Sequence, residues 1–214
     1  MRKLFKFLFW VALLAGLLIG ALRLVAIRWW RVPIDDPYLA ASVSPSIRAG
    51  DLILLWRGTK PGFGDLALCP EPKQPDRVVI GRIVGIDNDS IEVKGSTITI
   101  DGRRQKTESN CGERKFTESD PATGIEVEQS CEMEVLGGVT HKRGNAEPHP
   151  LKAQDAAGNV PPGHVWLVSD NRLFPYDSRD FGPVPRETCT ETVFFRLVGA
   201  EGFADPKRRN QYIP

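Results

Sequence analysis

One long apolar run at the start of the chain stands apart from the short apolar runs that follow it. The long run, Phe7–Leu22, has sixteen residues and lies between Lys6 and Arg23. A helix of this length spans roughly 24 Å, and the two flanking basic side chains can extend it across a bilayer by snorkelling. Because basic residues precede the run, the positive-inside rule predicts a cytoplasmic N-terminus, with the rest of the chain on the other side of the membrane.

A cleaved signal peptide is the alternative to a retained anchor, since a basic segment also precedes the apolar core of a signal peptide. The run is longer than that core usually is, and Trp29 and Trp30 follow it where an interfacial aromatic belt is expected. We therefore predict a single-pass anchor, with residues 1–6 in the cytoplasm, 7–27 across the membrane and 28–39 as a juxtamembrane linker.

The apolar runs after residue 39 are short and strand-like, and Gly, Pro, Asp and Asn separate them. No long segment with a 3.6-residue period appears there, so we predict a mainly β body over residues 40–200 and a C-terminal tail over 201–214. Turn dipeptides at Lys94-Gly95 and Asp101-Gly102 predict a hairpin over 90–103. The predicted strands are Leu52–Trp56, Leu66–Cys69, Val78–Val84, Ile91–Val93, Ile98–Ile100, Val127–Leu136, Val165–Val168 and Val193–Leu197.

Two stretches of the body, residues 103–125 and 141–162, are polar and poor in apolar residues. Each is predicted to be a surface loop, with the strand Val127–Leu136 between them. Together they predict a small β excursion, residues 103–162, inserted into the main fold. His141 and His149 lie in the second stretch and are therefore expected on the surface.

Charge is distributed unevenly along the chain. Residues 1–34 hold six Lys or Arg and no acidic residue, so the remainder, with 22 Lys or Arg and 27 Asp or Glu, has a formal net charge of −5. An acidic body lacks the basic surface that nucleic acid requires, so no nucleic-acid partner is expected. A hydrophobic content of 41% excludes both a polytopic membrane protein and a chain that is disordered throughout.

Four cysteines lie in the predicted extracytoplasmic body, where disulfides are permitted. Three pairings are possible, and the sequence cannot choose among them. Cys111 and Cys131 lie in the same excursion, so their pairing is favoured, which leaves Cys69 and Cys189 to pair if their strands are neighbours. The cysteines and histidines have no metal-ligand spacing, so neither a metal nor a cofactor is predicted.

Three segments contain candidate functional residues: Ser42–Asp51, Arg77–Gly85 and Ser169–Pro185. In this order they resemble the signal peptidase I family, membrane-bound serine endopeptidases that remove signal peptides from exported proteins. The family's S-M-x-P-[ST]-[LM]-x-x-G-D box is matched at Ser42, Pro45, Ser46, Gly50 and Asp51. Its G-D-N-R-x-x-S-x-D-S-R-x-x-G box is matched at Asp170, Asn171, Arg172, Asp177, Ser178, Arg179 and Gly182.

The resemblance implies a signal-peptidase-type β fold and a serine–lysine dyad with Ser42 as the nucleophile. Ser44 ranks second, because it lies one residue before Pro45 rather than three. A serine hydroxyl needs a neighbouring base, and a lysine serves only when burial lowers its pKa. The family's lysine, however, falls at Gly81, which has no side chain to accept a proton.

Two further catalytic positions also depart from the family pattern. The serine that supplies an oxyanion hydroxyl in many members falls at Ala40, and the serine that bonds the lysine falls at Pro175. Gly81 is expected to leave a gap where a lysine stem would pack. The remaining matched residues have a structural role by the resemblance, with Arg82, Asp177 and Arg179 expected in one ion-pair cluster, supported by Asp170, Asn171 and Ser178.

Activity would therefore need a different base. Lys60, Lys73 and Lys94 flank turns and are expected to face solvent, and His164 begins the strand that leads into the third segment. Two hypotheses follow: an active signal-peptide-cleaving endopeptidase with an unusual base, or a pseudo-peptidase that binds exported peptides or a partner without cutting them. A processing peptidase of the pilin-maturation type is a weaker third, since it lacks the same base. The implied partners are signal peptides of exported preproteins and membrane lipid, in the plasma (inner) membrane with a periplasmic body.

Overall fold

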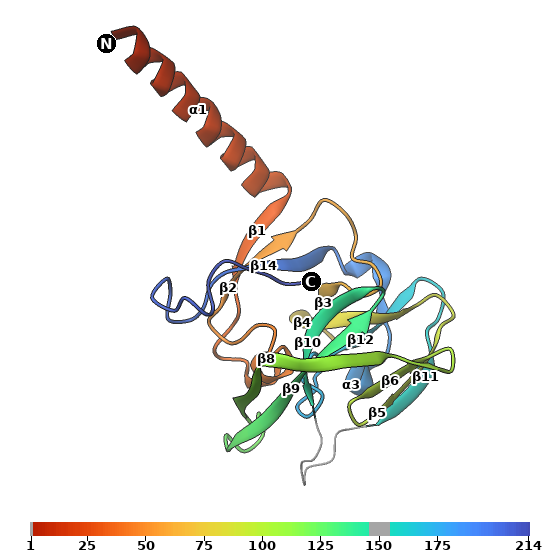
Figure 1. Cartoon of the computed structure of the whole chain (residues 1–214). Helices are drawn as coiled ribbons and strands as arrows, with labels where there is room; N and C mark the ends of the chain where they lie inside the picture. The colour runs from red at the N-terminus through yellow and green to blue at the C-terminus, as the bar shows by residue number, and fades with distance from the viewer. Residues whose placement is uncertain (1, 146–154) are drawn as a thin grey trace.

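A long N-terminal helix projects from a body built of strands (Figure 1). The computed structural model describes residues 2–145 and 155–214. Helix α1, Arg2–Val25, is long and apolar enough to cross a membrane, and its side chains are exposed. The prediction of a mainly β fold behind one apolar helix is confirmed.

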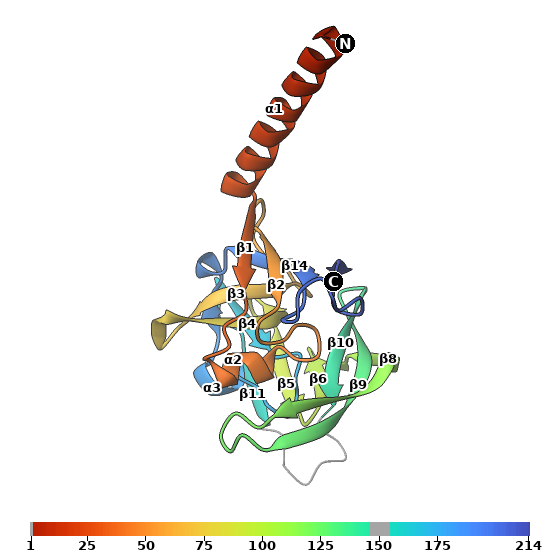
Figure 2. The same cartoon turned by 90° about the vertical axis from the view of Figure 1, so that its left-hand side faces the viewer.

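The helix leads directly into the main sheet. Strand β1, Ile27–Arg31, pairs antiparallel with β2, Leu52–Trp56, with Ile27 opposite Trp56. Part of the segment predicted as a linker is therefore a strand, and only one residue separates it from α1. Figure 2 shows β1 continuing from the base of α1 into the body. Trp30 packs against the core of this sheet. The Arg23 guanidinium lies over the ring of Trp29, with Arg23 Cζ 4.6 Å from the centre of that ring.

The main sheet has the order β1-β2-β14-β3-β4-β12-β13, with β15 paired to β14, and its neighbouring strands are antiparallel. The C-terminal residues predicted as a tail form β15, and Ile213 beside it is buried in the core. The strands not yet given are β3 (Leu66–Glu71), β4 (Gln74–Ile86), β12 (His164–Val168), β13 (Val184–Pro185), β14 (Glu191–Val198) and β15 (Gln211–Tyr212).

A second sheet of four strands contains the predicted hairpin. Strands β5, Ser90–Lys94, and β6, Thr97–Ile100, pair antiparallel and lie between β11, Ala156–Asn159, and β7, Arg103–Arg104. Alternate residues of β5 and β6 are buried, among them Ile91. The turn dipeptide Lys94-Gly95, from which the hairpin was predicted, lies at the connection between the two strands.

A third sheet, β10-β9-β8, corrects the prediction of two surface loops. Strands β8, Lys106–Ser119, and β10, Val139–Asn145, flank β9, Glu126–Leu136, and both pair with it antiparallel. Backbone hydrogen bonds hold these polar segments in strands, and Cys111 and Phe116 are buried side chains of β8. A strand with one exposed face needs few apolar residues, so its composition resembled that of a loop.

Three short helical segments lie at the ends of strands. Helix α2, Pro37–Ser42, starts at the N-cap Asp36, whose carboxylate accepts a hydrogen bond from Leu39 N. Helix α3, Ser178–Phe181, lies within the third segment of the sequence analysis, and the 3-10 helix η1, Arg186–Thr188, precedes β14. These helices have six residues or fewer, too short to produce a visible helical period.

Two disulfides connect parts of the body. Cys111 on β8 is bonded to Cys131 on β9, and Cys69 on β3 is bonded to Cys189 just before β14. These are the two pairs considered from the sequence. Among the described residues no group of His, Cys, Asp and Glu has the arrangement of a metal site.

Candidate functional site

Ser42 is the last residue of α2 and is fully buried. Its hydroxyl donates to the Leu39 carbonyl oxygen at 2.9 Å, and its own carbonyl accepts from Asn171 N at 3.0 Å. The structure therefore brings the first and third segments together at the expected nucleophile. Ser44, the second-ranked serine, is also buried and lies just before a cis peptide bond to Pro45.

Gly81 lies in the middle of β4, and no gap surrounds it. Its neighbour on β3 is Ala67, and a Cβ built on Gly81 would lie 3.0 Å from Leu167 Cβ and 3.6 Å from Val168 N on β12. The expectation of an open space for a lysine stem is therefore wrong. The partner of Leu167 in the register of β12 and β4 is Ile83, so Leu167 lies diagonally from Gly81, and it approaches the backbone closely because Gly81 has no side chain.

None of the alternative bases considered from the sequence bonds to Ser42. Within the described ranges, the single hydrogen bond of the Ser42 hydroxyl is the one to Leu39. Lys60 is exposed, Lys73 Nζ donates to the Asp180 carbonyl, and Lys94 pairs with Glu92 on the surface. His164 Nδ1 lies 3.0 Å from the Pro162 carbonyl at the start of β12. His149 lies outside the described residues.

The two positions beside the nucleophile and in the third segment also lack hydroxyls. Ala40 lies on α2 two residues before Ser42, and Pro175 lies in the loop between β12 and α3. The Asn171 side chain organises that loop, because its Oδ1 accepts from the backbone N–H groups of Leu173 and Phe174, each at 3.1 Å. Leu173 and Phe174 pack with Ala41 of α2 and Val127 of β9.

Arg82, adjacent to Gly81, forms a fully buried ion pair with Asp170. Arg82 Nε and Nη2 donate to the two carboxylate oxygens at 3.0 Å each, and Nη1 donates to the Gly64 carbonyl at 2.8 Å. The Ser46 hydroxyl donates to Asp170 Oδ2 at 2.5 Å. Burial alone would raise the pKa of Asp170, but Arg82 and His141, together with the hydrogen bonds from Arg82 and Ser46, outweigh it and hold that pKa at about 2.

Asp177 forms a separate buried pair with Arg179. Its carboxylate accepts from Arg179 Nε at 2.9 Å, from Arg179 Nη2 at 2.7 Å and from the backbone of Ser169 at 2.7 Å, and it also caps α3. Ser178 is buried, and its hydroxyl accepts from Leu167 N. The expected single cluster of Arg82, Asp177 and Arg179 is therefore two pairs. Asp170 continues from β12 beside Arg82, whereas Asp177 follows the turn and faces α3.

His141 corrects a further prediction, because it is 1% exposed rather than on the surface. Its Nε2 lies 3.3 Å from Glu134 Oε2 and 3.8 Å from Asp170 Oδ1. Burial, followed by the nearby charge of Arg82, lowers the pKa of His141, although Glu134 and Asp170 act in the opposite sense. Sequence reasoning missed this residue because β10 was taken for a loop. The available signal was the predicted strand Val127–Leu136, because a strand needs at least one partner strand and the polar stretches on either side were the nearest candidates.

Comparisons with known proteins find a matching family and several relatives. The model of the family "Signal peptidase, peptidase S26" matches residues 2–198. The "Mitochondrial ATP-independent inner membrane protease subunit 1a" of Arabidopsis thaliana is 28% identical over 167 residues, which cover 76% of this chain and 68% of that protein. "Signal peptidase I V" of Bacillus subtilis (strain 168) is 24% identical over 122 residues, 56% of this chain and 59% of that protein.

A solved structure also aligns with the chain. The crystal structure of a signal peptidase I from Enterococcus faecalis V583 aligns with a TM-score of 0.41 and 19% identity. The alignment covers 63% of this chain and 97% of that one.

Proposed function

Because the chain belongs to the signal peptidase family, peptidase S26, we propose that it is a membrane-anchored member that binds signal peptides of exported preproteins without cutting them. The observation that carries this proposal is the environment of Ser42. Its hydroxyl is buried and donates to the Leu39 carbonyl, and Gly81 occupies the position at which the resemblance expects a base. The proposal places the N-terminus in the cytoplasm and the body outside the plasma (inner) membrane.

The chemical reason is that a serine hydroxyl attacks a peptide bond only when a base accepts its proton. The carbonyl of Leu39 accepts a hydrogen bond but is too weak a base to take the proton at neutral pH. The members of such a dyad act as a unit, so a serine without its base loses the route to an alkoxide rather than a fraction of it.

An active endopeptidase is the second candidate, and one observation favours it. Asn171 N donates to the Ser42 carbonyl, so the end of α2 and the loop after β12 are held together as a nucleophile would require. In this version, a base from elsewhere reaches Ser42 when substrate is bound. Both candidates keep signal peptides as partners and differ only in cleavage.

Cleavage is tested with the full chain in neutral detergent and a preprotein that carries a signal peptide. The proposal expects no product from the wild type and none from Ser42→Ala. Efficient cleavage by the wild type that Ser42→Ala abolishes would overturn it in favour of the active endopeptidase. A gain-of-function variant combines Gly81→Lys with Pro175→Ser and with Leu167→Gly, which removes the Leu167 Cβ that a Cβ at Gly81 would meet. Activity in this triple variant would show that Ser42 was in place and lacked only its base.

Binding is measured separately, by fluorescence anisotropy of a labelled synthetic signal peptide. The wild type and Ser42→Ala should bind the peptide with equal affinity, because the proposal assigns Ser42 no role beyond its place in the fold. A scrambled peptide of the same composition is the control. Equal binding of the scrambled and native peptides would contradict the proposal.

A further inference from the structure

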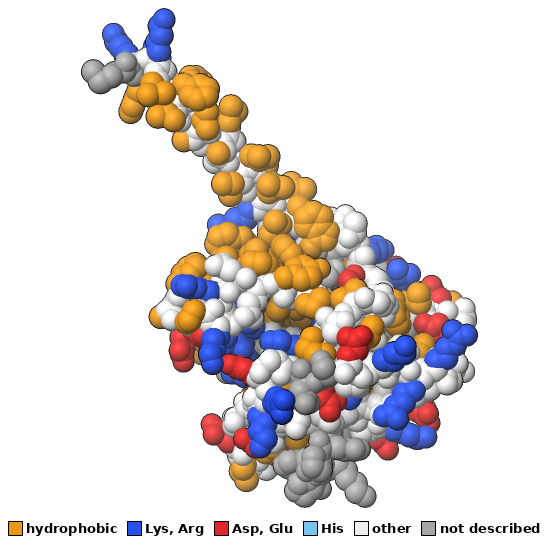
Figure 3. Space-filling view, viewed as in Figure 1, with side chains coloured by type: hydrophobic (Ala, Val, Ile, Leu, Met, Phe, Trp, Pro, Cys, Tyr) orange, Lys and Arg blue, Asp and Glu red, His pale blue; other side chains and the backbone are white. Residues whose placement is uncertain are grey.

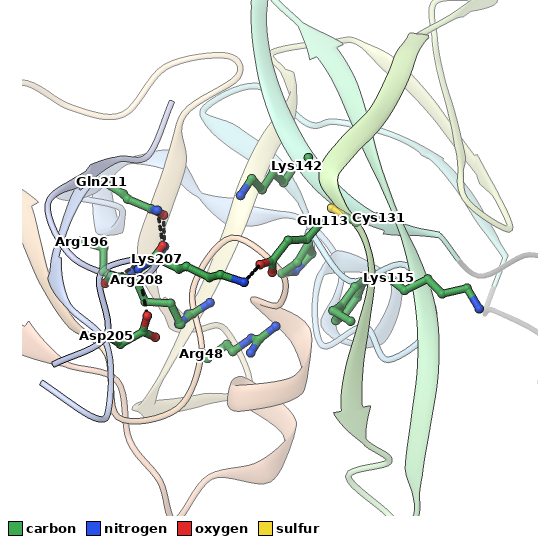
Figure 4. Close-up of a pocket in the computed structure, with 13 residues that line it drawn as sticks. Arg48, Glu113, Lys115, Cys131, Lys142, Arg196, Asp205, Lys207, Arg208 and Gln211 are labelled. Carbon is green, nitrogen blue, oxygen red and sulfur yellow. Dashed lines mark hydrogen bonds and ion pairs between the residues drawn. The ribbon is translucent and has the colours of Figure 1, made fainter.

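A cavity of about 540 Å³ lies beyond the nucleophile segment. It is lined by the chain after Pro45, the disulfide-bonded region of β8 and β9, Lys142 of β10, and the segment from β14 to β15 (Figure 4). We call it the basic cavity, because its lining contains six Lys or Arg and two carboxylates. The cations are Arg48, Lys115, Lys142, Arg196, Lys207 and Arg208, and the carboxylates are Glu113 and Asp205.

Four of the six cations have carboxylate partners. Arg196 and Arg208 share Asp51, at 3.5 Å and 2.6 Å, and this carboxylate is fully buried behind the cavity. Lys207 Nζ pairs with Glu113 at 2.9 Å. Lys115 pairs with Glu128 at 2.5 Å, and Figure 4 shows its side chain extending away from the other cations. One of these carboxylates therefore serves two arginines.

Arg48 and Lys142 are the other two cations; Arg48 is half-buried, whereas Lys142 is exposed at the rim of the cavity. In the part of the chain that the structure describes, neither side chain has a hydrogen bond or an ion pair, and Arg48 Nε is buried without a partner. Burial lowers the pKa of both groups, and repulsion by Arg208 and Arg196 lowers them further. Glu118, Asp51 and Glu113 offset part of this repulsion at Arg48. The cavity thus holds two cations close to other cations and without direct partners.

We propose that the basic cavity binds a phosphate group, with Arg48 and Lys142 as its principal contacts. A phosphate monoester carries a charge of about −1.5 to −2 at neutral pH, close to that of the two unpaired cations. The guanidinium of Arg48 can donate two parallel hydrogen bonds to phosphate oxygens, and the ammonium of Lys142 adds a point charge. A volume of about 540 Å³ exceeds that of a lone phosphate, so the cavity has room for the group to which the phosphate is esterified.

The position of the cavity suggests a lipid headgroup as one source of that phosphate. Arg196 lies on β14, which pairs with β2, and β2 pairs with β1 directly after α1. The segment that supplies Lys207 and Arg208 also exposes two aromatic residues, Phe203 (61%) and Tyr212 (69%). A soluble phosphate ester offers the same chemistry, so the experiment must separate the two sources.

The test uses the full chain in a neutral detergent and isothermal titration calorimetry. The probes are inorganic phosphate, glycerol 3-phosphate, and the short-chain lipids dihexanoyl phosphatidylglycerol and dihexanoyl phosphatidylcholine. Arg48→Gln with Lys142→Gln should weaken phosphate-ester binding at least tenfold. The matched control, Lys60→Gln with Lys94→Gln, removes two exposed positive charges outside the cavity and should change the affinity less than twofold.

The outcomes distinguish the sources and can overturn the proposal. Tighter binding of phosphatidylglycerol than of glycerol 3-phosphate identifies the lipid headgroup, and the reverse order identifies a soluble ester. Binding of an acidic peptide such as hexaglutamate without binding of any phosphate probe would overturn the proposal. An equal loss of phosphate-ester affinity in the two double variants would also overturn it. Thermal unfolding without ligand provides a second readout. Arg48→Gln should raise the Tm, because it removes a repelled cation, whereas a purely structural arginine would lower it.

Discussion

Gly81 and Leu167 share one small space between β4 and β12, and this contact limits how the site can be altered. The Cβ that any other residue would add at position 81 meets Leu167 Cβ at 3.0 Å. A lysine therefore cannot be introduced there without movement of β12, the strand that leads to Asp170 and Asn171. The loss of the base and the packing of the strands are thus linked through a single contact.

The first prediction follows from this contact. Gly81→Lys alone should lower the free energy of unfolding by about 1–3 kcal/mol, the usual cost of overpacking. Adding Leu167→Gly should cost less than the sum of the two single changes, because it removes the Leu167 Cβ that the new side chain would meet. Urea unfolding of the wild type, both single variants and the double variant measures the coupling. Strict additivity would show that Gly81 and Leu167 do not constrain each other.

The Arg82–Asp170 pair gives a second prediction at the same scale. Arg82→Met leaves a carboxylate buried without its main partner and should destabilise the fold by about 3–5 kcal/mol. The control is Lys115→Met, which breaks an exposed pair with Glu128 and should change stability by no more than about 1 kcal/mol. Chemical denaturation at neutral pH measures both variants. Equal losses of unfolding free energy in the two variants would mean that burial of the Arg82–Asp170 pair does not increase its contribution to stability.

The third prediction concerns pH. The folded-state pKa of Asp170, about 2, lies below its ordinary value of 3.8. This carboxylate therefore contributes stability that is fully present above about pH 4 and is lost as the pH falls towards 2, by roughly 2 kcal/mol in all. Asp170→Asn should remove this part of the pH dependence. The free energy of unfolding between pH 2 and 6, compared for the two proteins, should therefore be steeper for the wild type.

At the scale of elements, the sequence predicted the strands that can be recognised from a single contiguous run of residues. The strands at Leu52–Trp56 and Val165–Val168 are apolar runs between turn residues, and they appear as β2 and β12. Helix α2 was missed because six residues give less than two turns of periodicity. Strand β8 was missed because its stability comes from pairing with β9, a partner that composition does not reveal.

The candidate site could be predicted only in part for the same reason, because contacts between distant segments are not visible in the sequence. Ser42, Asp170 and Asp177 follow from the resemblance of short boxes, and the structure places them around α2, β12 and α3. The partner of Arg82 and the burial of His141 depend on which strands become neighbours. Such contacts join residues far apart in the chain, so no sequence pattern within one segment contains them.

The fourth prediction concerns the two disulfides as links between elements. Replacing Cys111 and Cys131 with alanine should destabilise the fold by about 3 kcal/mol, because it opens a loop of 20 residues in the unfolded chain. Replacing Cys69 and Cys189, which are 120 residues apart, should cost more, about 4–5 kcal/mol in the chain-entropy model. Denaturation of both double variants under oxidising conditions gives the order. A larger loss of stability on removal of the Cys111–Cys131 pair would show that local packing, not loop entropy, determines how much each disulfide stabilises the fold.

For the molecule as a whole, the connection between α1 and the body determines how the body meets a membrane. One residue separates α1 from β1, so the anchor cannot swing freely on a linker. Figure 3 shows hydrophobic side chains along α1 and around its junction with the body, with basic side chains at the far end of the helix. The basic side chains at that end are the ground on which the positive-inside rule predicts a cytoplasmic N-terminus.

The final prediction tests this topology. The full chain, expressed in a bacterium with an outer membrane, should remain with the membrane fraction after extraction at alkaline pH, because α1 is long and apolar enough to cross the bilayer. Protease added to intact spheroplasts should digest the body, residues 40–200, and spare a cytoplasmic control protein. As a matched control, Leu14→Arg with Leu17→Arg places two charges in the middle of α1, at about 2.5–3.5 kcal/mol each, and should release the chain from the membrane or abolish its insertion. Protection of the body in intact spheroplasts, together with its digestion after lysis, would place it in the cytoplasm. The body could not then meet the exported side of a signal peptide.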